Sequence, residues 1–248
     1  MGSIPAFGEA DLTNCDREPI HVPGSIQPYG LLLAMDPQGL VIEQVAGDTV
    51  AVLGLAAEDL LGRPLAGIID AAAAARVAAL AAHDQQPPRT HVLLGAVGEP
   101  GRTAHDAIFH VSDGVALLDL VPRAAEEEEP LAIVQTMLGA TRGIEAEGSL
   151  HASIANTVRA ATGYDRVLIY RFAQDGSGEV VAEAREPELE SLMGLHYPAS
   201  DVPRQARELY RKNWLRLIPD RRYAPAPITP AINPRTRRPV DLSLSVLR

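Results

Sequence analysis

The chain has 248 residues, 22 basic and 32 acidic side chains, and a formal charge of −10. This charge argues against a nucleic-acid-binding surface, and the length allows one large domain or two ordinary ones. The single cysteine, Cys15, excludes a disulfide framework within the chain and fits a reducing compartment. No apolar run is long enough to span a membrane and no signal-peptide pattern follows Met1, so we expect a cytoplasmic protein with no membrane partner.

The first part of the chain predicts an arm followed by a hairpin. Residues 1–21 have no hydrophobic periodicity and predict an extended arm that carries Cys15. Two apolar runs, Leu31–Met35 and Leu40–Val45, flank the turn Asp36-Pro-Gln-Gly39. This pattern is typical of an antiparallel hairpin.

The following residues alternate between helix and strand patterns. We expect helices over Ala56–Leu61 and Ala71–Ala82, the second of them capped by Asp70. Three strands are expected after them, at His91–Val97, Ala107–Val111 and Val115–Leu120, with an Asp-Gly turn between the last two. Two strands, short helices and three antiparallel strands predict an α+β domain of the PAS kind over residues 22–122.

An acidic stretch separates this domain from the second half of the chain. Residues 123–145 predict a linker with a helix, in which Leu131, Val134 and Leu138 have a coiled-coil-like spacing. A helix over Ser149–Ala161 and strands over Arg166–Phe172 and Val180–Ala184 then predict a second α+β domain, over residues 146–248.

The most informative stretch of this second domain is a stiff turn followed by a helix. Two prolines enclose the polar turn of Tyr197–Pro203, in which Ser200 or Asp201 can cap the helix expected over Arg204–Trp214. Arg207, Tyr210 and Trp214 share one face of that helix. The face fits an amphipathic ligand with acidic groups, and it equally fits a surface helix with its aromatic edge packed inward.

Common catalytic and metal-binding patterns do not occur in this sequence. It has no Gly-x-Ser-x-Gly elbow and no glycine-rich phosphate loop before a helix. His105 and His110 are the closest pair of histidines, but their odd spacing in a strand places them on opposite faces. We therefore expect no enzyme activity and no metal site within these residues.

Aromatic residues crowd into the second half, with seven of the ten between Tyr164 and Tyr223. This crowding favours a large apolar pocket with polar tips, in which Arg207 and Arg216 would bind a carboxylate, although a plain aromatic core is the alternative. Cys15 also has two interpretations. It is either incidental or functional, and its flanks Asp16, Arg17 and Glu18 give its thiol no clear activation.

Two long motifs resemble bacteriophytochromes. They are Cys-Asp-Arg-Glu-Pro-Ile-His-Val-Pro-Gly-Ser-Ile-Gln-Pro at residues 15–28 and Tyr-Pro-Ala-Ser-Asp-Val-Pro at residues 197–203. The segments at 163–172 and 177–184 are similar to that family as well. The resemblance implies a PAS domain and then a GAF domain, each an antiparallel sheet with flanking helices. It also implies a figure-of-eight knot, in which the proline-rich residues 219–240 form a lasso around the arm near Ile26.

The same resemblance implies a cofactor and its site. Biliverdin, an open-chain tetrapyrrole, would be attached through a thioether between Cys15 and its ring-A vinyl group. The motif Asp201-Val202-Pro203 would lie at the pyrrole nitrogens, with the carbonyl of Asp201 as acceptor and its carboxylate assisting proton exchange. Tyr170 and Tyr197 match positions around ring D, and Tyr210, Arg216 and Arg248 match positions near a propionate.

The family further implies a red and far-red photoreceptor that signals by isomerisation of the ring C/D double bond. A homodimer, a downstream PHY domain and a histidine kinase-like output module would be its partners. Two departures are that Tyr29 replaces the usual His and that the chain ends at Arg248, before the remaining GAF strands, so we expect a fragment of a longer protein. The alternatives are a PAS–GAF sensor of a small ligand such as a cyclic nucleotide or haem, and a dimerisation scaffold based on the helix at Leu131–Ile144.

Overall fold

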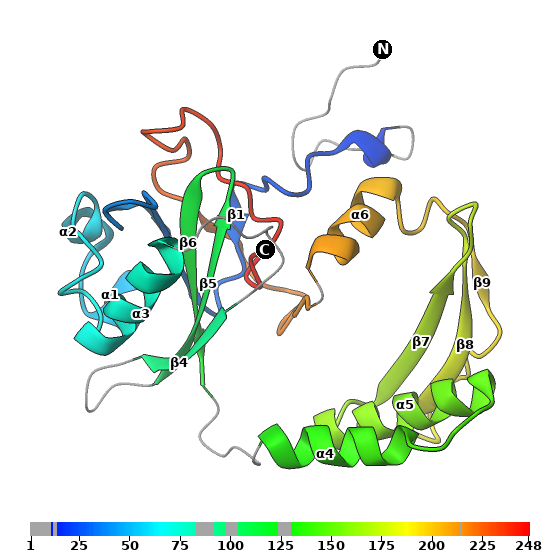
Figure 1. Ribbon diagram of the computed structural model, residues 1–248. Helices are drawn as coiled ribbons and strands as arrows, with labels where there is room; N and C mark the ends of the chain where they lie inside the picture. Colours follow the sequence, from blue (N-terminus) through cyan, green and yellow to red (C-terminus); the bar gives the residue numbers. More distant parts are fainter. Residues whose placement is uncertain (1–10, 12–13, 83–91, 98–103, 124–129, 214) are drawn as a thin grey trace. The chain divides into compact units, whose positions relative to one another are not determined.

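The computed structural model describes residues 11, 14–82, 92–97, 104–123, 130–213 and 215–248. They form two compact units. The first unit consists of Met1–Arg123 with Gln205–Arg248, and the second consists of Ala124–Arg204. Both units combine helices with antiparallel strands, which confirms the α+β class (Figure 1).

The first unit is built on a five-stranded antiparallel sheet with the strand order β3-β2-β6-β5-β4. Its strands are β2 (Leu31–Met35), β3 (Ile42–Ala46), β4 (Val92–Val97), β5 (His105–Ser112) and β6 (Val115–Pro122). The predicted hairpin is confirmed as β2 and β3, and its turn is closed by the Asp36 carboxylate, which accepts from the amides of Gln38, Gly39 and Val41. The three later strands are confirmed too, although His91, the expected start of β4, lies outside the described residues.

Three helices cover one face of this sheet: α1 (Thr49–Leu53), α2 (Ala57–Leu60) and α3 (Ala71–Ala82) (Figure 1). The predicted cap of α3 is confirmed, because the Asp70 carboxylate accepts from the amide of Ala73 at 2.8 Å. Helix α1 was not expected. Two residues could have indicated it from the sequence. Asp48 caps the start of the helix by accepting from the amide of Ala51 at 2.9 Å, and the left-handed Gly54 ends it.

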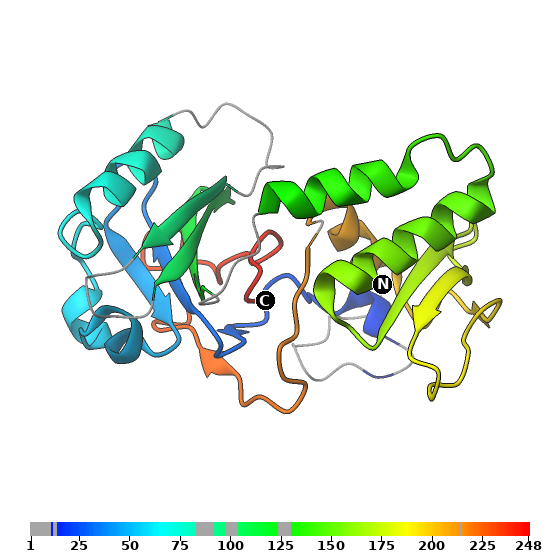
Figure 2. The same cartoon turned by 90° about the horizontal axis from the view of Figure 1, so that it is seen from below.

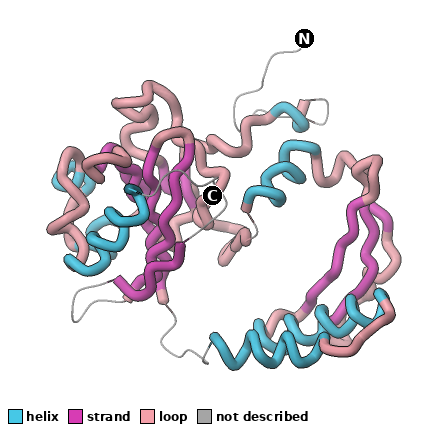
Figure 3. The backbone as a smooth tube through the Cα atoms, in the orientation of Figure 1, coloured by secondary structure: helices cyan, strands magenta, loops and turns pink. Residues whose placement is uncertain are grey.

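The C-terminal segment, residues 215–248, covers the other face of the same sheet (Figure 3). Leu32 and Leu117 of the sheet pack with Ile228, Val240 and Leu242 of the segment in one buried cluster. All five residues of β2 are therefore buried, which explains why its sequence is a continuous apolar run rather than an alternating one.

The segment also holds the N-terminal arm. Strand β1 (Ser25–Ile26) pairs with β10 (Ala226–Pro227), and the amide of Leu242 donates to the carbonyl of His21 at 2.7 Å. The amide of Gln27 donates to the carbonyl of Leu247 at 2.8 Å. The arm is thus bonded to two separate stretches of the segment, while the figure-of-eight knot itself stays a prediction.

The second unit has helices α4 (Pro130–Thr141) and α5 (Glu147–Thr162) and strands β7 (Arg166–Phe172), β8 (Gly178–Arg185) and β9 (His196–Tyr197). The sheet order is β7-β8-β9 and all pairs are antiparallel. Figure 2 shows α4 and α5 side by side, and α5 packs on the sheet through the small residues Ala155, Ala182 and Ala184. Of the described helices, none has the length and apolarity to cross a lipid bilayer.

Helix α6 (Arg204–Lys212) begins directly after Pro203 and passes from the second unit into the first. It ends two residues earlier than expected. The Asn213 side chain explains this end, because its Oδ1 accepts from the amide of Leu215 at 3.1 Å, a local bond that competes with continuation of the helix. Trp214, predicted on the aromatic face of the helix, lies outside the described residues.

Candidate functional site

Three aromatic rings gather on one side of the second unit's sheet. Val167 and Ile169 face α5, so the alternate residues of β7 point to the opposite side of the sheet. There the ring of Tyr170 lies 5.0 Å from that of Phe172 and 6.0 Å from that of Tyr197, between ring centroids. The expected grouping of Tyr170 with Tyr197 is therefore present.

Gly178 makes room for these rings. It pairs with Phe172 on one neighbouring strand and with Tyr197 on the other. A Cβ atom at this position would overlap the Tyr170 ring. The strand expected from the sequence began only at Val180, and the close approach at Gly178 could not be predicted because it depends on three strands being placed together.

Asp201 is electrostatically coupled to this cluster. Burial, followed by the nearby Asp201 carboxylate and Tyr197, raises the pKa of the Tyr170 hydroxyl. Tyr170 therefore stays protonated and available as a hydrogen-bond donor at neutral pH. The amide of Asp201 donates to the carbonyl of Pro198 at 3.1 Å, and the half-buried Val202 and Pro203 connect this turn to α6.

In the first unit, the cysteine lies against the start of α6. Cys15 opens a short 3₁₀ helix, Cys15–Arg17, and is half-buried. Its amide donates to the carbonyl of Asp11 at 2.9 Å, and its carbonyl accepts from the Gln205 side chain on α6. Gln205 was not predicted from the sequence, because its position within the helix does not indicate that its side chain contacts the distant arm.

The first unit also brings together two of the expected arginines. Burial, followed by the positive charge of Arg216, lowers the pKa of Arg248 to about 10, while Tyr210 and Asp241 act in the opposite direction. Arg248 donates to the carbonyl of Ile20 at 3.4 Å, but its Nε is buried without a hydrogen-bond partner among the described residues.

This arrangement fits an anion. A partly desolvated guanidinium with an unsatisfied donor, subject to the charge of a second guanidinium, is stabilised by a carboxylate or a phosphate. Tyr210 and Arg216 are exposed, so both remain accessible to a ligand. Within the part of the chain that the structure describes, no three His, Cys, Asp or Glu side chains gather as a metal site.

Comparison with known proteins shows which family this chain resembles. Residues 15–123 match the family model described as PAS fold. Cyanobacterial phytochrome B of Nostoc sp. (strain PCC 7120) is 38% identical over 97% of this chain and 32% of its own length. A bacteriophytochrome of Xanthomonas campestris pv. campestris is 39% identical over 98% of this chain and 38% of its own length. The chain thus spans about a third of the length of these relatives.

The solved structures agree. The chromophore-binding domain of Stigmatella aurantiaca phytochrome P1 superimposes with a TM-score of 0.82 at 40% identity, over 94% of this chain and 78% of that domain. The chromophore-binding domain of the R. palustris bacteriophytochrome RpBphP3 superimposes with the same TM-score at 39% identity. Two compact α+β units, the two long motifs and this similarity lead to one conclusion: the chain belongs to the phytochrome family.

Proposed function

We propose that this chain binds biliverdin covalently and is the light-sensing part of a red and far-red photoreceptor. When bound, a bilin would supply the absorption of light and the isomerisation of its ring C/D double bond. The protein binds the pigment, orients it and holds protons at defined atoms. The observation that carries the proposal is the Nε of Arg248, which is buried without a hydrogen-bond partner among the described residues and therefore calls for the carboxylate of a ligand.

The roles of the other residues follow from their chemistry. Arg216 and Arg248, with Tyr210, would bind propionate groups through charge-assisted hydrogen bonds. Tyr170 and Tyr197 would form an aromatic wall at ring D, with Asp201 as its acidic neighbour, and Val202 and Pro203 would complete the turn. The arginines and Tyr210 suit the acidic side chains of such a molecule, and the tyrosines of the second unit suit a flat apolar body.

Cys15 would attach the pigment by adding its thiol across the ring-A vinyl group. The Cys15 S–H bond and the vinyl π bond would break while an Sγ–carbon bond and a carbon–hydrogen bond form, so the addition would need no oxidant. The bond from Gln205 to the Cys15 carbonyl supports this role, because it fixes the backbone of an otherwise irregular arm beside α6. Such pre-placement can replace strong activation of the thiol.

The rest of the proposal concerns the longer protein. A PHY domain and a histidine kinase-like output module would follow in the full-length chain, and the protein would work as a cytoplasmic homodimer. We propose no enzyme activity for the photosensory region itself.

Mixing the apoprotein with biliverdin and recording the absorption spectrum tests the proposal. We expect a red absorbance band that changes on illumination, and zinc-dependent fluorescence of the protein band on a denaturing gel. Cys15→Ser should bind the pigment, with a red-shifted band because one more double bond stays conjugated, and should lose the gel fluorescence. The absence of any red band with biliverdin would favour a PAS–GAF sensor of another small ligand.

A further inference from the structure

A buried carboxylate in the PAS sheet is bonded to the segment that carries Arg248. Asp119 lies in the middle of β6, is fully buried, and faces the C-terminal segment. Its Oδ2 accepts from the amide of Val246 at 2.9 Å, and its Oδ1 accepts from the hydroxyl of Ser245 at 3.0 Å. The Ser245 hydroxyl in turn accepts from the amide of Leu247 at 3.1 Å.

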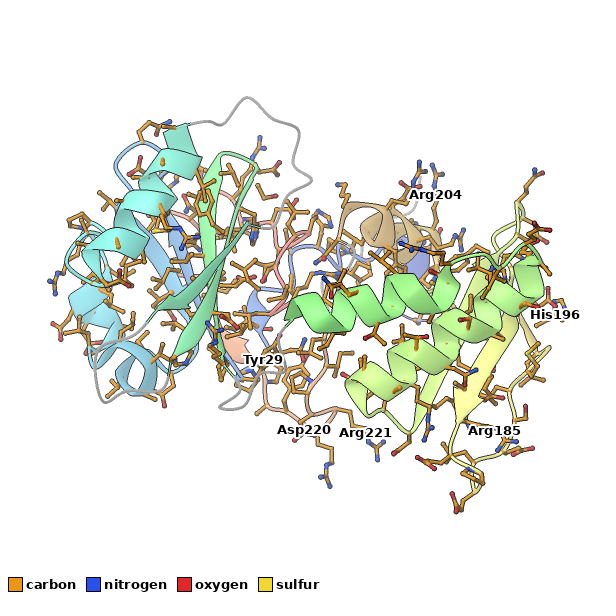
Figure 4. The ribbon with its side chains drawn as sticks, turned by 60° about the horizontal axis from the view of Figure 1, so that its bottom comes forward. Tyr29, Arg185, His196, Arg204, Asp220 and Arg221 are labelled. Carbon is orange, nitrogen blue, oxygen red and sulfur yellow. The ribbon has the colours of Figure 1, made fainter. Side chains whose placement is uncertain are left out.

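Tyr29 holds the same residue from its other side. The Tyr29 hydroxyl donates to the carbonyl of Val246 at 2.9 Å, and Figure 4 shows Tyr29 away from helices α1–α3. Val246 therefore has both its amide and its carbonyl fixed by side chains of the PAS fold. This contact gives a use to Tyr29, which replaces the histidine typical of the family.

Two buried amide side chains extend the network to Arg216. Asn213 donates to the carbonyl of Ser245 at 3.3 Å and accepts from the amide of Leu215. The Gln27 Nε2 atom donates to the carbonyls of Leu217 and Arg248, at 2.8 and 3.0 Å. Both neighbours of Arg216 in sequence, and Arg248 itself, are thus hydrogen-bonded to one buried polar frame.

We propose that Asp119 is a positioning residue that holds Arg248 and Arg216 at the spacing an anionic ligand requires. The inference rests on the proposed function for the identity of that ligand, a bilin propionate. Two guanidinium groups repel each other, so their spacing has to be imposed by the backbone beneath them. A buried carboxylate with two donors on adjacent residues is a rigid anchor for that backbone. Asp119 itself does not contact the ligand.

The choice of variants separates positioning from mere stability. Asp119→Leu removes both bonds while retaining an apolar side chain of similar size. Asp119→Asn can still accept from the amide of Val246 and can donate to the Ser245 hydroxyl. Val77→Ala is the matched control, because it makes a cavity among the helices on the other face of the same sheet.

Biliverdin affinity is measured in a Cys15→Ser background, where binding is reversible. We expect Asp119→Leu to weaken binding by about tenfold or more, Asp119→Asn by less than about threefold, and Val77→Ala to have no effect while the protein stays folded. In a protein that already carries Arg248→Ala, Asp119→Leu should reduce biliverdin affinity much less, because the two residues act on the same contact. Equal losses in both backgrounds would overturn the proposal.

A second readout needs no pigment. Hydrogen exchange of the apoprotein should become faster at residues 213–217 and 245–248 in Asp119→Leu, and stay unchanged there in Val77→Ala. If Asp119→Leu does not fold, Ser245→Ala tests the same frame and should give the same pattern with a smaller amplitude. Unchanged exchange at 213–217 would overturn the proposal. If the variants show this exchange pattern but the wild-type protein binds no biliverdin, the proposed function is refuted and the frame stands.

Discussion

At the scale of single residues, Gly178 sets how closely three aromatic rings can approach. It lies opposite Phe172 and Tyr197 in the sheet, and the Tyr170 ring occupies the space that a side chain would need. An added methyl group therefore has to displace the ring or the strands, because interiors tolerate little extra volume.

We expect Gly178→Ala to lower the free energy of unfolding by about 1–3 kcal/mol and to shift the Tyr170 ring resonances in NMR spectra. Gly148→Ala is the matched control, because nothing lies within 4 Å of a Cβ at Gly148, which is in the first turn of α5. That control should be neutral or slightly stabilising. Unchanged stability and unchanged Tyr170 signals in Gly178→Ala would show that the aromatic cluster accommodates the added methyl group without strain.

Arg216 gives a second residue-scale prediction. Arg216→Ala should weaken biliverdin binding by about 1.5–3 kcal/mol, because a charge-assisted contact to a propionate is lost. The absorption maximum should move little, because propionates are remote from the conjugated system. Titration in the Cys15→Ser background measures both quantities, with Arg211→Ala on the exposed side of α6 as the control. A large colour shift with unchanged affinity would mean that Arg216 lies elsewhere in the bound state.

Single residues also show where sequence reasoning stops. The pairing of Tyr170 with Tyr197 and of Arg216 with Arg248 could be expected only from the family motifs, since 27 and 32 positions separate the partners. Asp119, Gln27 and Asn213 could not be predicted as a network. Nothing in the local sequence of any of the three indicates its partners, which become visible only when the C-terminal segment lies on the sheet.

At the scale of elements, the proline-rich segment is held in place by side-chain hydrogen bonds rather than by regular secondary structure. Asn233 is fully buried, and its Nδ2 donates to Glu43 Oε2 and Gln44 Oε1, both at 2.9 Å. Arg235 binds the other oxygen of Glu43 at 2.8 Å and the carbonyl of Gly114 at 2.8 Å. These side-chain bonds to β3 and to the β5–β6 turn replace the ladder that prolines cannot form.

Asn233→Asp tests this anchoring. The new carboxylate would face Glu43 and an amide oxygen, so we expect the free energy of unfolding to fall by about 1–3 kcal/mol in urea denaturation. Adding Glu43→Gln should restore a large part of this loss, because the new amide can donate to the introduced carboxylate. Asn156→Asp, the same change at an exposed site on α5, should have little effect. Failure of Glu43→Gln to rescue stability would contradict the role assigned to the pair.

The elements themselves were largely predictable, for local reasons. Alternation, turn residues and caps specify the β2–β3 hairpin, α3, β5–β6, α5 and β7–β8 within short stretches of chain. The course of residues 215–248 was not predictable from periodicity, because its structure depends on bonds to residues about 190 positions away, such as Glu43 and Gln44.

At the scale of the whole molecule, the first unit gathers sequence from both ends of the chain. Residues 205–248 belong to the same compact unit as the PAS sheet, through the cluster and the hydrogen bonds that cover its second face. The domain limits expected from the sequence, with GAF over 146–248, stay a prediction. The consequence for folding is that β2 and β6 can complete their core only after the C-terminal segment has arrived.

The buried Asp119 makes the stability of this unit depend on pH in a defined direction. Burial raises the pKa of Asp119 from its usual value of 3.8 to about 7, against the opposing bonds from Val246 and Ser245. Between these two values the folded protein binds a proton that the unfolded chain has released. Stability therefore falls as the pH rises from about 4 to about 7, by up to about 1.4 kcal/mol per pH unit.

Asp119→Asn supplies the reference, because it keeps the shape of the side chain and cannot titrate. We expect the difference in free energy of unfolding between wild type and Asp119→Asn to be flat below about pH 4, to decrease with rising pH up to about 7, and to be flat again above it. Tyr29, with its pKa raised to about 12 by burial and the nearby Asp119, stays neutral throughout this window. Repeating the series with His110→Gln checks whether the imidazole on the neighbouring strand β5 contributes to this difference. A difference that rises with pH over this window would mean that Asp119 is ionised in the folded protein at acid pH, with the carboxylate stabilised more by its two donors than it is penalised by burial.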